Sequence, residues 1–167
     1  TLQEEGGNIG TQTIVWSGTT NGEIDQVIGD IPDDWKKNSS IKQLQVGSSC
    51  KIIGSYSFYY CTSIAGDLVI PDSVTSLGSY AFHYCDSLTS VTFGSNLTSI
   101  GNDSFSYGYG FTGDLVIPDS VTSIGAYAFS DCAFDGTLTL PSNLNFTTIE
   151  LGAFSYMANT GPLVIPD

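Results

Sequence analysis

The sequence predicts an α/β repeat solenoid, a right-handed coil with short parallel strands on one face and short helical turns or loops on the other. The first observation is that the pentapeptide LVIPD stands at 68–72, 115–119 and 163–167. The second is a phenylalanine that returns at a nearly constant interval, and the third is a short apolar stretch that opens each interval. Self-similarity at a period of about 20–50 residues is typical of stacked repeats.

The phenylalanine series gives the length of the repeat. The stretches that contain it read IIGSYSFYYC, SLGSYAFHYC, SIGNDSFSYG, SIGAYAFSDC and TIELGAFSYM. The steps are 24, 23, 24 and 25 residues, between Phe58, Phe82, Phe105, Phe129 and Phe154. One such unit has too few apolar groups to bury its own face, whereas stacked units bury a continuous column of equivalent side chains. We therefore expect equivalent positions to lie about 4.8 Å apart, the spacing of paired strands.

Each unit is predicted to begin with a short strand. Apolar residues two apart, followed by Pro or Gly, indicate a strand with one buried face. Proline ends such a strand because it cannot donate a hydrogen bond to the ladder. The predicted strands are 44–46, 68–70, 91–93, 115–117, 138–140 and 163–165. Two further apolar positions precede each phenylalanine and are predicted to face the core: Cys50, Val74, Leu97, Val121 and Phe146, then Ile53, Leu77, Ile100, Ile124 and Ile149.

The repeats divide the chain into two parts. Residues 41–167 are predicted to form the solenoid, about five coils of 23–25 residues and the start of a sixth. Residues 1–40 do not fit the repeat and are predicted to be an N-terminal cap, because a solenoid needs a polar-faced segment over its first coil. Within the cap, TQTIVWSG indicates a strand, a short helix is expected before Pro32, and Trp16 and Trp35 are candidates to shield the core. The polar start and the end on a strand suggest a fragment or a processed chain.

Two kinds of unit alternate along the solenoid. Asp72 and Asp119 stand where the other kind of unit has Ser95 and Ser142, and a second acidic position alternates with Ser or Thr in the same way. Like charges in neighbouring coils repel. Alternation doubles the separation of the carboxylates to about 10 Å, one Debye length at moderate salt. Tandem duplication of a pair of units explains the pattern equally well.

The motif IPDSVTSIGAYAFSDC at 117–132 resembles the repeat of BspA-like leucine-rich repeat proteins, and the resemblance covers residues 41–167. The sequence departs from the family pattern at Glu150, where glycine is usual, and at Gly108 and Met157, where cysteine is usual. The resemblance implies a non-catalytic, secreted or cell-surface module that binds a protein or glycan, as expected of adhesion-like proteins of bacteria and some protists. The alternative is a structural spacer in a larger surface protein that carries another functional domain.

The resemblance also implies that partners bind on the concave strand face. The predicted face is made of small and mildly acidic side chains, and it lacks the Trp, Tyr and Arg anchors of typical binding hot spots. The residues expected to form it are Asp67, Val69, Ser90, Thr92, Asp114, Val116, Thr137 and Thr139.

Tyrosines form a second candidate surface. Two series recur at fixed places in the repeat: Tyr60, Tyr84, Tyr107 and Tyr156, interrupted by Asp131, and then Tyr56, Tyr80 and Tyr127. Stacked coils turn such series into aromatic rows. Exposed rows bind glycans or protein surfaces, whereas the preferred interpretation is that the rings pack on one another and cover the edge of the core.

Composition excludes several kinds of partner. The 167 residues carry a formal charge of −13, from 17 acidic residues against 4 basic ones. Binding to nucleic acid or to an anionic membrane surface needs clustered cations, so neither is expected. No apolar run approaches the roughly 20 residues of a membrane span, so no membrane insertion is expected in this segment.

The cysteines are predicted to be buried, reduced thiols that act as small core side chains. Cys85 and Cys132 lie two coils apart, about 10 Å, which is beyond the reach of a disulfide. Cys61 and Cys85 lie in adjacent coils, so a bridge between them stays open. A zinc site is not expected, because the sequence has one His and no C-x-x-C pair.

No catalytic set and no cofactor site is predicted. His83 occupies a position that holds Tyr or Ser in the other units, and this variability predicts a solvent-facing side chain. A catalytic His needs a Ser or Cys beside it and an acid to orient it. The acidic residues follow no EF-hand pattern, so calcium is not expected either.

Overall fold

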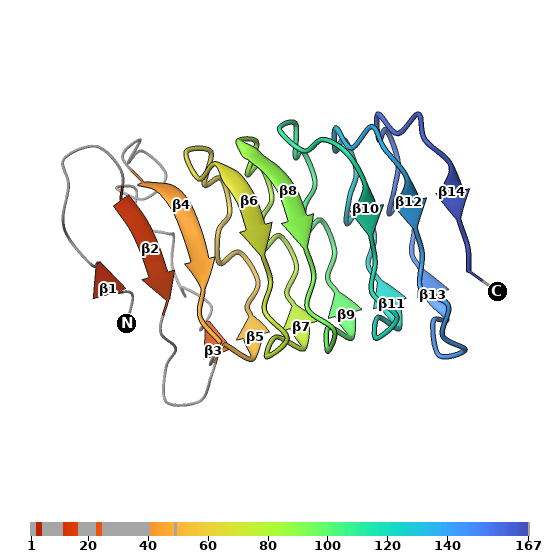
Figure 1. Ribbon diagram of the computed structural model, residues 1–167, viewed down its shortest axis with the longest axis horizontal. Coiled ribbons are helices and arrows are strands. Elements are labelled where there is room, and N and C mark those ends of the chain that lie inside the picture. The colour runs from red at the N-terminus through yellow and green to blue at the C-terminus, as the bar shows by residue number, and fades with distance from the viewer. Residues whose placement is uncertain (1–2, 5–11, 17–22, 25–40, 49, 167) are drawn as a thin grey trace.

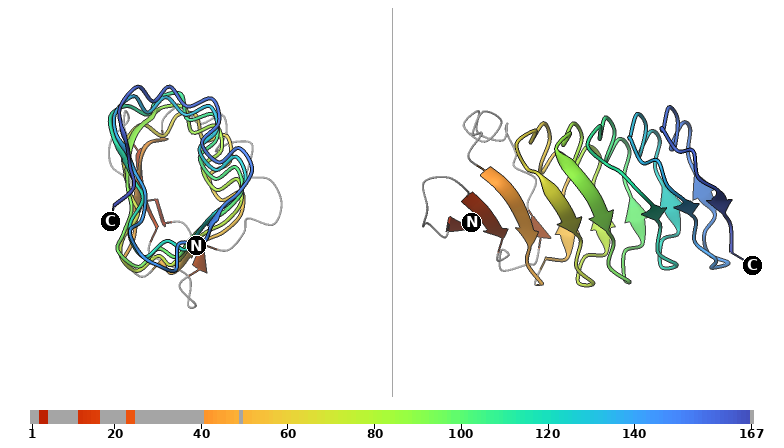
Figure 2. Two further views of the ribbon diagram at one scale, coloured as in Figure 1. Left: turned by 90° about the vertical axis from the view of Figure 1, so that its right-hand side faces the viewer. Right: turned by 45° about the horizontal axis from the view of Figure 1, so that its top comes forward.

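The structure is a computed structural model in which the chain winds into a stack of coils with a strand on each of two sides (Figure 1). Seen along the stack, successive coils superpose on one closed outline (Figure 2). The residues that the structure describes are 3–4, 12–16, 23–24, 41–48 and 50–166. The predicted repeat solenoid is confirmed.

The first row of strands contains the LVI-type stretches. Its members pair in three sheets, β1-β2-β4, β6-β8 and β10-β12-β14, in which all pairs are parallel except β1 with β2. The pairing is interrupted between β4 and β6 and between β8 and β10. At the second interruption, the N–H of Thr112 donates to the Thr89 carbonyl at 3.0 Å. The strands are β1 (Gln3–Glu4), β2 (Gln12–Trp16), β4 (Ile41–Val46), β6 (Gly66–Val69), β8 (Leu88–Thr92), β10 (Leu115–Val116), β12 (Leu138–Thr139) and β14 (Leu163–Val164).

The second row of strands is one continuous parallel sheet that the sequence did not predict. Its order is β13-β11-β9-β7-β5-β3. The isoleucine or leucine of each unit is in register with its counterpart, so that Ile53 pairs with Leu77 and Leu77 with Ile100. The strands are β3 (Glu23–Ile24), β5 (Ile52–Ile53), β7 (Ser76–Leu77), β9 (Ser99–Ile100), β11 (Ser123–Ile124) and β13 (Thr148–Ile149).

Tandem turns occupy the side of the coil after the second row, where helical turns or loops were expected. Backbone N–H groups there alternate in direction. The N–H of Tyr59 donates to the Tyr56 carbonyl three residues back at 3.3 Å, whereas the N–H of Phe58 donates to the Ala81 carbonyl of the next coil at 2.8 Å. The described residues contain no regular helix, and thus none that is long and apolar enough to cross a membrane.

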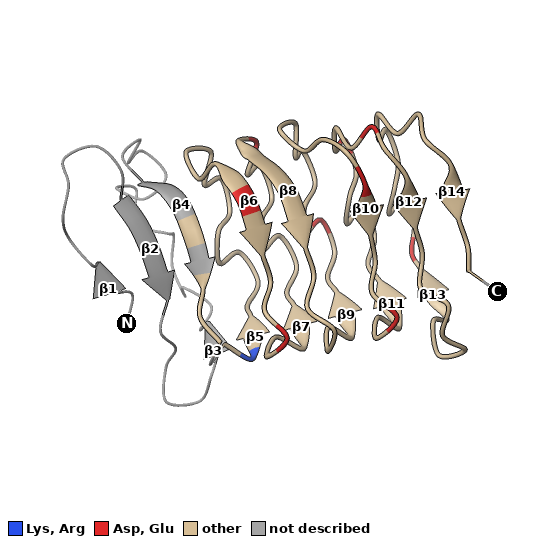
Figure 3. Cartoon of the chain, viewed as in Figure 1, with Lys and Arg blue, Asp and Glu red and all other residues tan. Residues whose placement is uncertain are grey.

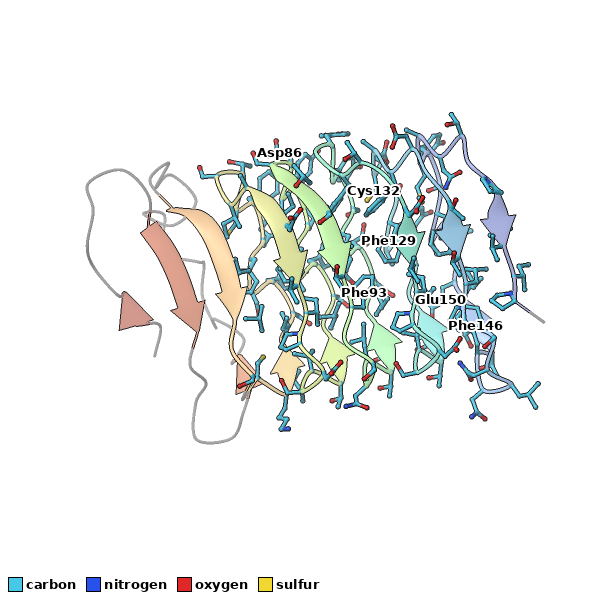
Figure 4. The ribbon with its side chains drawn as sticks, in the orientation of Figure 1. Asp86, Phe93, Phe129, Cys132, Phe146 and Glu150 are labelled. Atoms are coloured by element: carbon cyan, nitrogen blue, oxygen red, sulfur yellow. The ribbon has the colours of Figure 1, made fainter. Side chains whose placement is uncertain are left out.

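The phenylalanines of the repeat series form a stacked column inside the coils. The ring centroids of Phe82 and Phe105 are 5.3 Å apart with 9° between their planes, and Phe105 and Phe129 are 5.3 Å apart with 2°. Phe93 meets this column edge-on from the first strand row, 5.7 Å from Phe105, and Figure 4 labels it beside Phe129. The predicted stacking of equivalent residues is therefore confirmed at the centre of the core.

The departure at Gly108 has a packing cause. A side chain on Gly108 would collide with the ring of Phe111, which is fully buried and stacks on Phe134 at 4.6 Å. Phe111 therefore fills the space that cysteine takes in other coils. The other two departures from the family pattern lie at the surface or at the edge of the core. Glu150 is exposed, and Met157 packs against the core cluster.

Strands of the first 40 residues continue both rows. β2 pairs in parallel with β4, β3 pairs in parallel with β5, and β1 lies antiparallel on β2. The assignment of residues 1–40 as a cap stays a prediction. Of the stretch expected to hold a short helix before Pro32, the structure describes Glu23–Ile24, which form strand β3; the rest of that stretch and the shielding role of Trp35 lie outside the described residues.

Candidate functional site

The eight residues predicted to bind a partner lie on one surface, the outward side of β6, β8, β10 and β12 and the turns beside them. We call this surface the strand face. Outward and inward residues alternate on each strand: Val69 is 57% exposed and Val116 is 54% exposed, whereas Leu68 is completely buried. Pairing in register sets Val69 beside Thr92 and Val116 beside Thr139. The face thus presents rows of equivalent side chains across neighbouring coils.

Carboxylates on this side of the molecule bind to the next coil. Asp67 accepts a hydrogen bond from the Ser90 hydroxyl at 2.7 Å. Asp114 accepts one from the backbone N–H of Thr137 at 2.7 Å. These two acidic residues of one unit type therefore each meet a donor supplied by the other unit type.

The turn after each strand repeats this arrangement. Asp119 accepts hydrogen bonds from the N–H of Ser142 at 2.7 Å and from its hydroxyl at 2.9 Å. The bond from the Ser142 N–H, followed by that from the hydroxyl, lowers the pKa of the Asp119 carboxyl. The alternation of Asp with Ser along the chain therefore has a basis in hydrogen bonding, besides the repulsion and duplication considered above.

Acidic residues are scattered over the described coils from Asp67 to Glu150 (Figure 3). Residues 50–166 carry nine Asp and Glu against one lysine, Lys51. The excess of carboxylates gives this part of the chain a negative electrostatic potential.

The tyrosine rows are stacked ladders. Tyr84 lies between Tyr60, at a centroid distance of 4.5 Å and an angle of 20°, and Tyr107, at 4.4 Å and 11°. In the second series, Tyr56 stacks on Tyr80 at 4.8 Å and 9°. The rings pack on one another, as the preferred interpretation expected. Their stacked faces are covered, and the side chains remain half-buried or exposed.

The ladder ends where the sequence breaks the series. Asp131 holds the tyrosine position in the coil after Tyr107, so Tyr156 stands apart and is 84% exposed. Tyr109, which the sequence analysis did not single out, leans edge-on against Tyr84 at 6.4 Å and Tyr107 at 6.0 Å. The rings that contact one another at this side of the solenoid are therefore those of Tyr60, Tyr84, Tyr107 and Tyr109.

A left-handed backbone holds the tyrosines of both series. The φ angle is 59° at Tyr60 and 57° at Tyr84, in the region that costs an L-residue about 1–2 kcal/mol. The N–H of Tyr60 donates to the His83 carbonyl of the next coil at 2.8 Å, and this bonding helps to offset the strain. The sequence contained a signal for this conformation: Asp131 and Gly152 replace tyrosine in the two series, and both residue types tolerate positive φ.

The prediction that His83 faces solvent is wrong. The side chain is only 7% exposed, stacks on Tyr59 at 5.1 Å and lies edge-on to Tyr80, Tyr84 and Tyr107. Its Nδ1 is 2.5 Å from the Ser106 hydroxyl. Burial lowers the pKa of His83, and the nearby Asp103 carboxylate opposes part of that shift. The imidazole therefore packs as a buried polar ring among the surrounding tyrosines.

The pairing of His83 with Ser106 does not make a nucleophile. Ser106 is completely buried, so a substrate cannot reach its oxygen. The carboxylate of Asp103 accepts a hydrogen bond from the Ser106 hydroxyl at 3.2 Å. It therefore binds the serine and does not orient the ring of His83. A catalytic triad needs the acid on the histidine.

The cysteines are buried thiols, as predicted, and no disulfide joins Cys61 to Cys85. The thiol of Cys85 donates to the Phe58 carbonyl at 3.1 Å, and that of Cys132 donates to the Phe105 carbonyl at 3.0 Å. Burial raises the pKa of Cys132 to about 12 and raises that of Cys85 well above its ordinary value. Within the described ranges, no group of three His, Cys, Asp or Glu side chains comes together to hold a metal.

Known proteins match this architecture. The family profile described as "BspA type Leucine rich repeat region" matches residues 29–160 in 6 copies. The crystal structure of a leucine-rich repeat protein from T. pallidum is similar, with a TM-score of 0.63 and 25% identity over 89% of this chain and 75% of that one. A leucine-rich cell surface protein from Faecalibacterium prausnitzii gives a TM-score of 0.52 and 23% identity over 90% of this chain and 51% of that one. No curated protein matches the sequence. With a profile match over more than half of its length, the chain belongs to the BspA-type leucine-rich repeat family.

Proposed function

We propose that this chain is a non-catalytic module of a secreted or cell-surface protein, and that it binds a protein or glycan through the strand face. The observation that carries the proposal is the regular exposed surface of Val69, Thr92, Asp114 and Val116 over consecutive coils. The strands below hold these side chains at fixed spacing, so a partner meets a surface that is already ordered. Binding to an ordered surface loses little conformational entropy.

The chemistry of the face favours a protein partner with a positively charged surface. Two half-exposed valines provide apolar contact, while Asp67 and Asp114 surround them with negative charge. Complementary charge speeds association and selects against acidic partners. Because the face lacks Trp, Tyr and Arg anchors, we expect the affinity to depend strongly on salt concentration.

The tyrosine ladder is a less suitable glycan site than its sequence pattern suggested. A sugar ring stacks on the exposed face of an aromatic ring. The stacking covers both faces of Tyr84 and one face each of Tyr60 and Tyr107. A glycan on the ladder would meet ring edges and hydroxyl groups instead.

A binding screen with paired variants tests the proposal. The chain would be presented to immobilised host matrix proteins and to a glycan array, together with the variant V69K/V116K. The matched control is L144K/L151K, which adds the same charge at apolar residues that are 98% and 74% exposed elsewhere. We expect a ligand whose binding is lost in the first variant and retained in the second. No ligand in either class, or equal binding by both variants, would contradict the proposal.

The second candidate function is a structural spacer. The observation that favours it is the continuous bonding between coils, which joins the second strand row across six strands and makes the stack a stiff support. A full-length gene that encodes a catalytic or anchoring domain beside the repeats, together with strand-face variants that leave adhesion unchanged, would favour the spacer.

A further inference from the structure

The stacked tyrosines hold their phenol rings face to face across neighbouring coils. The three stacked pairs are Tyr56 with Tyr80, Tyr60 with Tyr84, and Tyr84 with Tyr107, at centroid distances of 4.8, 4.5 and 4.4 Å. The planes within each pair are 9°, 20° and 11° apart. In this geometry the π orbitals of one ring point at those of the next.

We propose that this ladder is a site of oxidative modification, at which a haem peroxidase with hydrogen peroxide joins stacked tyrosines into dityrosine. Each of two phenols gives up one electron and one proton. One molecule of hydrogen peroxide takes up these two electrons and two protons and becomes two molecules of water. The two phenoxyl radicals share their unpaired electrons in one carbon–carbon bond between ortho positions. The two ortho hydrogens then move as protons to the oxygens, which restores both phenols. The product has lost two hydrogen atoms and ties adjacent coils together.

Position favours coupling within the chain over coupling between chains. The left-handed backbone and the bonds between coils fix each tyrosine: the N–H of Tyr84 donates to the Ser106 carbonyl at 3.0 Å, and that of Tyr107 to the Ser130 carbonyl at 2.9 Å. Groups held in contact react as if at very high concentration, because no encounter is needed. A radical formed on Tyr84 therefore has a partner on either side.

Access favours the same residues. Tyr60 is 37% exposed and Tyr109 is 55% exposed, so an oxidant in solution reaches the ladder at both of them. Tyr109 touches Tyr84 and Tyr107 edge-on, which provides a path for an electron from the stack. The four cysteine side chains are the sulfur groups that would compete as reductants, and all four are buried.

A pair of double variants with equal numbers of tyrosines tests the proposal. Each stacked pair contains Tyr80 or Tyr84, so Y80F/Y84F removes one phenol from every pair and keeps all the rings. The control Y127F/Y156F removes two phenols from tyrosines that are 40% and 84% exposed and stack on no tyrosine in the part of the chain that the structure describes. Circular dichroism and thermal midpoints establish that all three proteins are folded.

The readouts are dityrosine fluorescence, intact mass and oligomeric state after treatment of dilute protein with peroxidase and hydrogen peroxide. We expect the parent chain and Y127F/Y156F to give monomers that lack two hydrogen atoms and fluoresce, at a rate independent of protein concentration. We expect Y80F/Y84F to lose most of that signal. Dityrosine that forms only in dimers, or in equal yield in Y80F/Y84F, would overturn the proposal. So would a folded parent chain that yields none.

Discussion

Asp72 of one coil accepts two hydrogen bonds from Ser95 of the next, at 2.7 Å from its N–H and 3.0 Å from its hydroxyl. The amide of Asn96 completes the contact by donating to the Asp72 carbonyl at 2.9 Å. Asp119 and Ser142 repeat the same pair of bonds two coils further on. At the outer edge of the solenoid, hydrogen bonds therefore join neighbouring coils, in addition to the stacking of apolar side chains in the core.

The first prediction concerns acid stability. The N–H of Ser95, and after it the Ser95 hydroxyl, lowers the pKa of Asp72, as Ser142 does for Asp119. A depressed folded-state pKa contributes stability that is present above the unfolded-state value of about 3.9 and is lost as pH falls through the folded-state value. We expect D72N/D119N to lower the thermal midpoint at pH 7 and to match the parent chain in strong acid. The control is D86N. Among the described residues, no hydrogen bond joins the Asp86 carboxylate to the next coil, so D86N should lower the thermal midpoint at pH 7 by less than D72N/D119N does. Equal midpoints for parent and D72N/D119N at pH 7 would refute this.

The second prediction concerns the phenylalanine column. Phe105 is completely buried between Phe82 and Phe129, whereas Phe154 ends the column and is only partly buried. We expect Phe105→Ala to cost about 3–5 kcal/mol of the free energy of unfolding, because it opens a cavity that the stacked coils cannot close. Phe154→Ala should cost clearly less. Denaturant titration measures both, and a larger loss for Phe154→Ala would contradict the assignment of the core.

The third prediction separates backbone strain from contact. Gly152 has φ of 64°, and a Cβ there would lie 2.5 Å from the ring of Tyr127. Gly113 has φ of 73° with open space around it. We expect Gly113→Ala to cost about 1–2 kcal/mol from the backbone alone, and Gly152→Ala to cost more. In a Tyr127→Ser background the two substitutions should become similar, which a double-mutant cycle tests. A cost of Gly152→Ala that stays the same with and without the tyrosine ring would refute the contact.

The spacing of equivalent residues was enough to predict the stack, because in a solenoid equal positions in sequence become neighbours in space. It was not enough for the second strand row: Ser76–Leu77 and its counterparts are too short to show the alternation that identifies a strand. Variation at the position of His83 suggested exposure. The structure shows instead a layer that accepts different polar groups, in which Ser155 donates to Ser130 at 3.0 Å. The register places the residues of the strand face side by side, as expected, and their binding role stays a prediction. The left-handed tyrosines were missed, since tyrosine is not typical of positive φ.

The fourth prediction concerns the thiols. Burial raises the pKa of Cys132 to about 12, so at neutral pH the group is a thiol that donates to the Phe105 carbonyl, and the reactive thiolate is absent. A folded-state pKa above the unfolded value of about 8.5 gives stability that is present below pH 8.5 and lost as pH rises towards 12. We expect iodoacetamide to label Cys132 in the native chain only as fast as the coils open, and to label it at once in denaturant. The variant C132A should lose less stability between neutral and alkaline pH than the parent chain does. Rapid labelling of the folded parent would show that this coil is open to solvent.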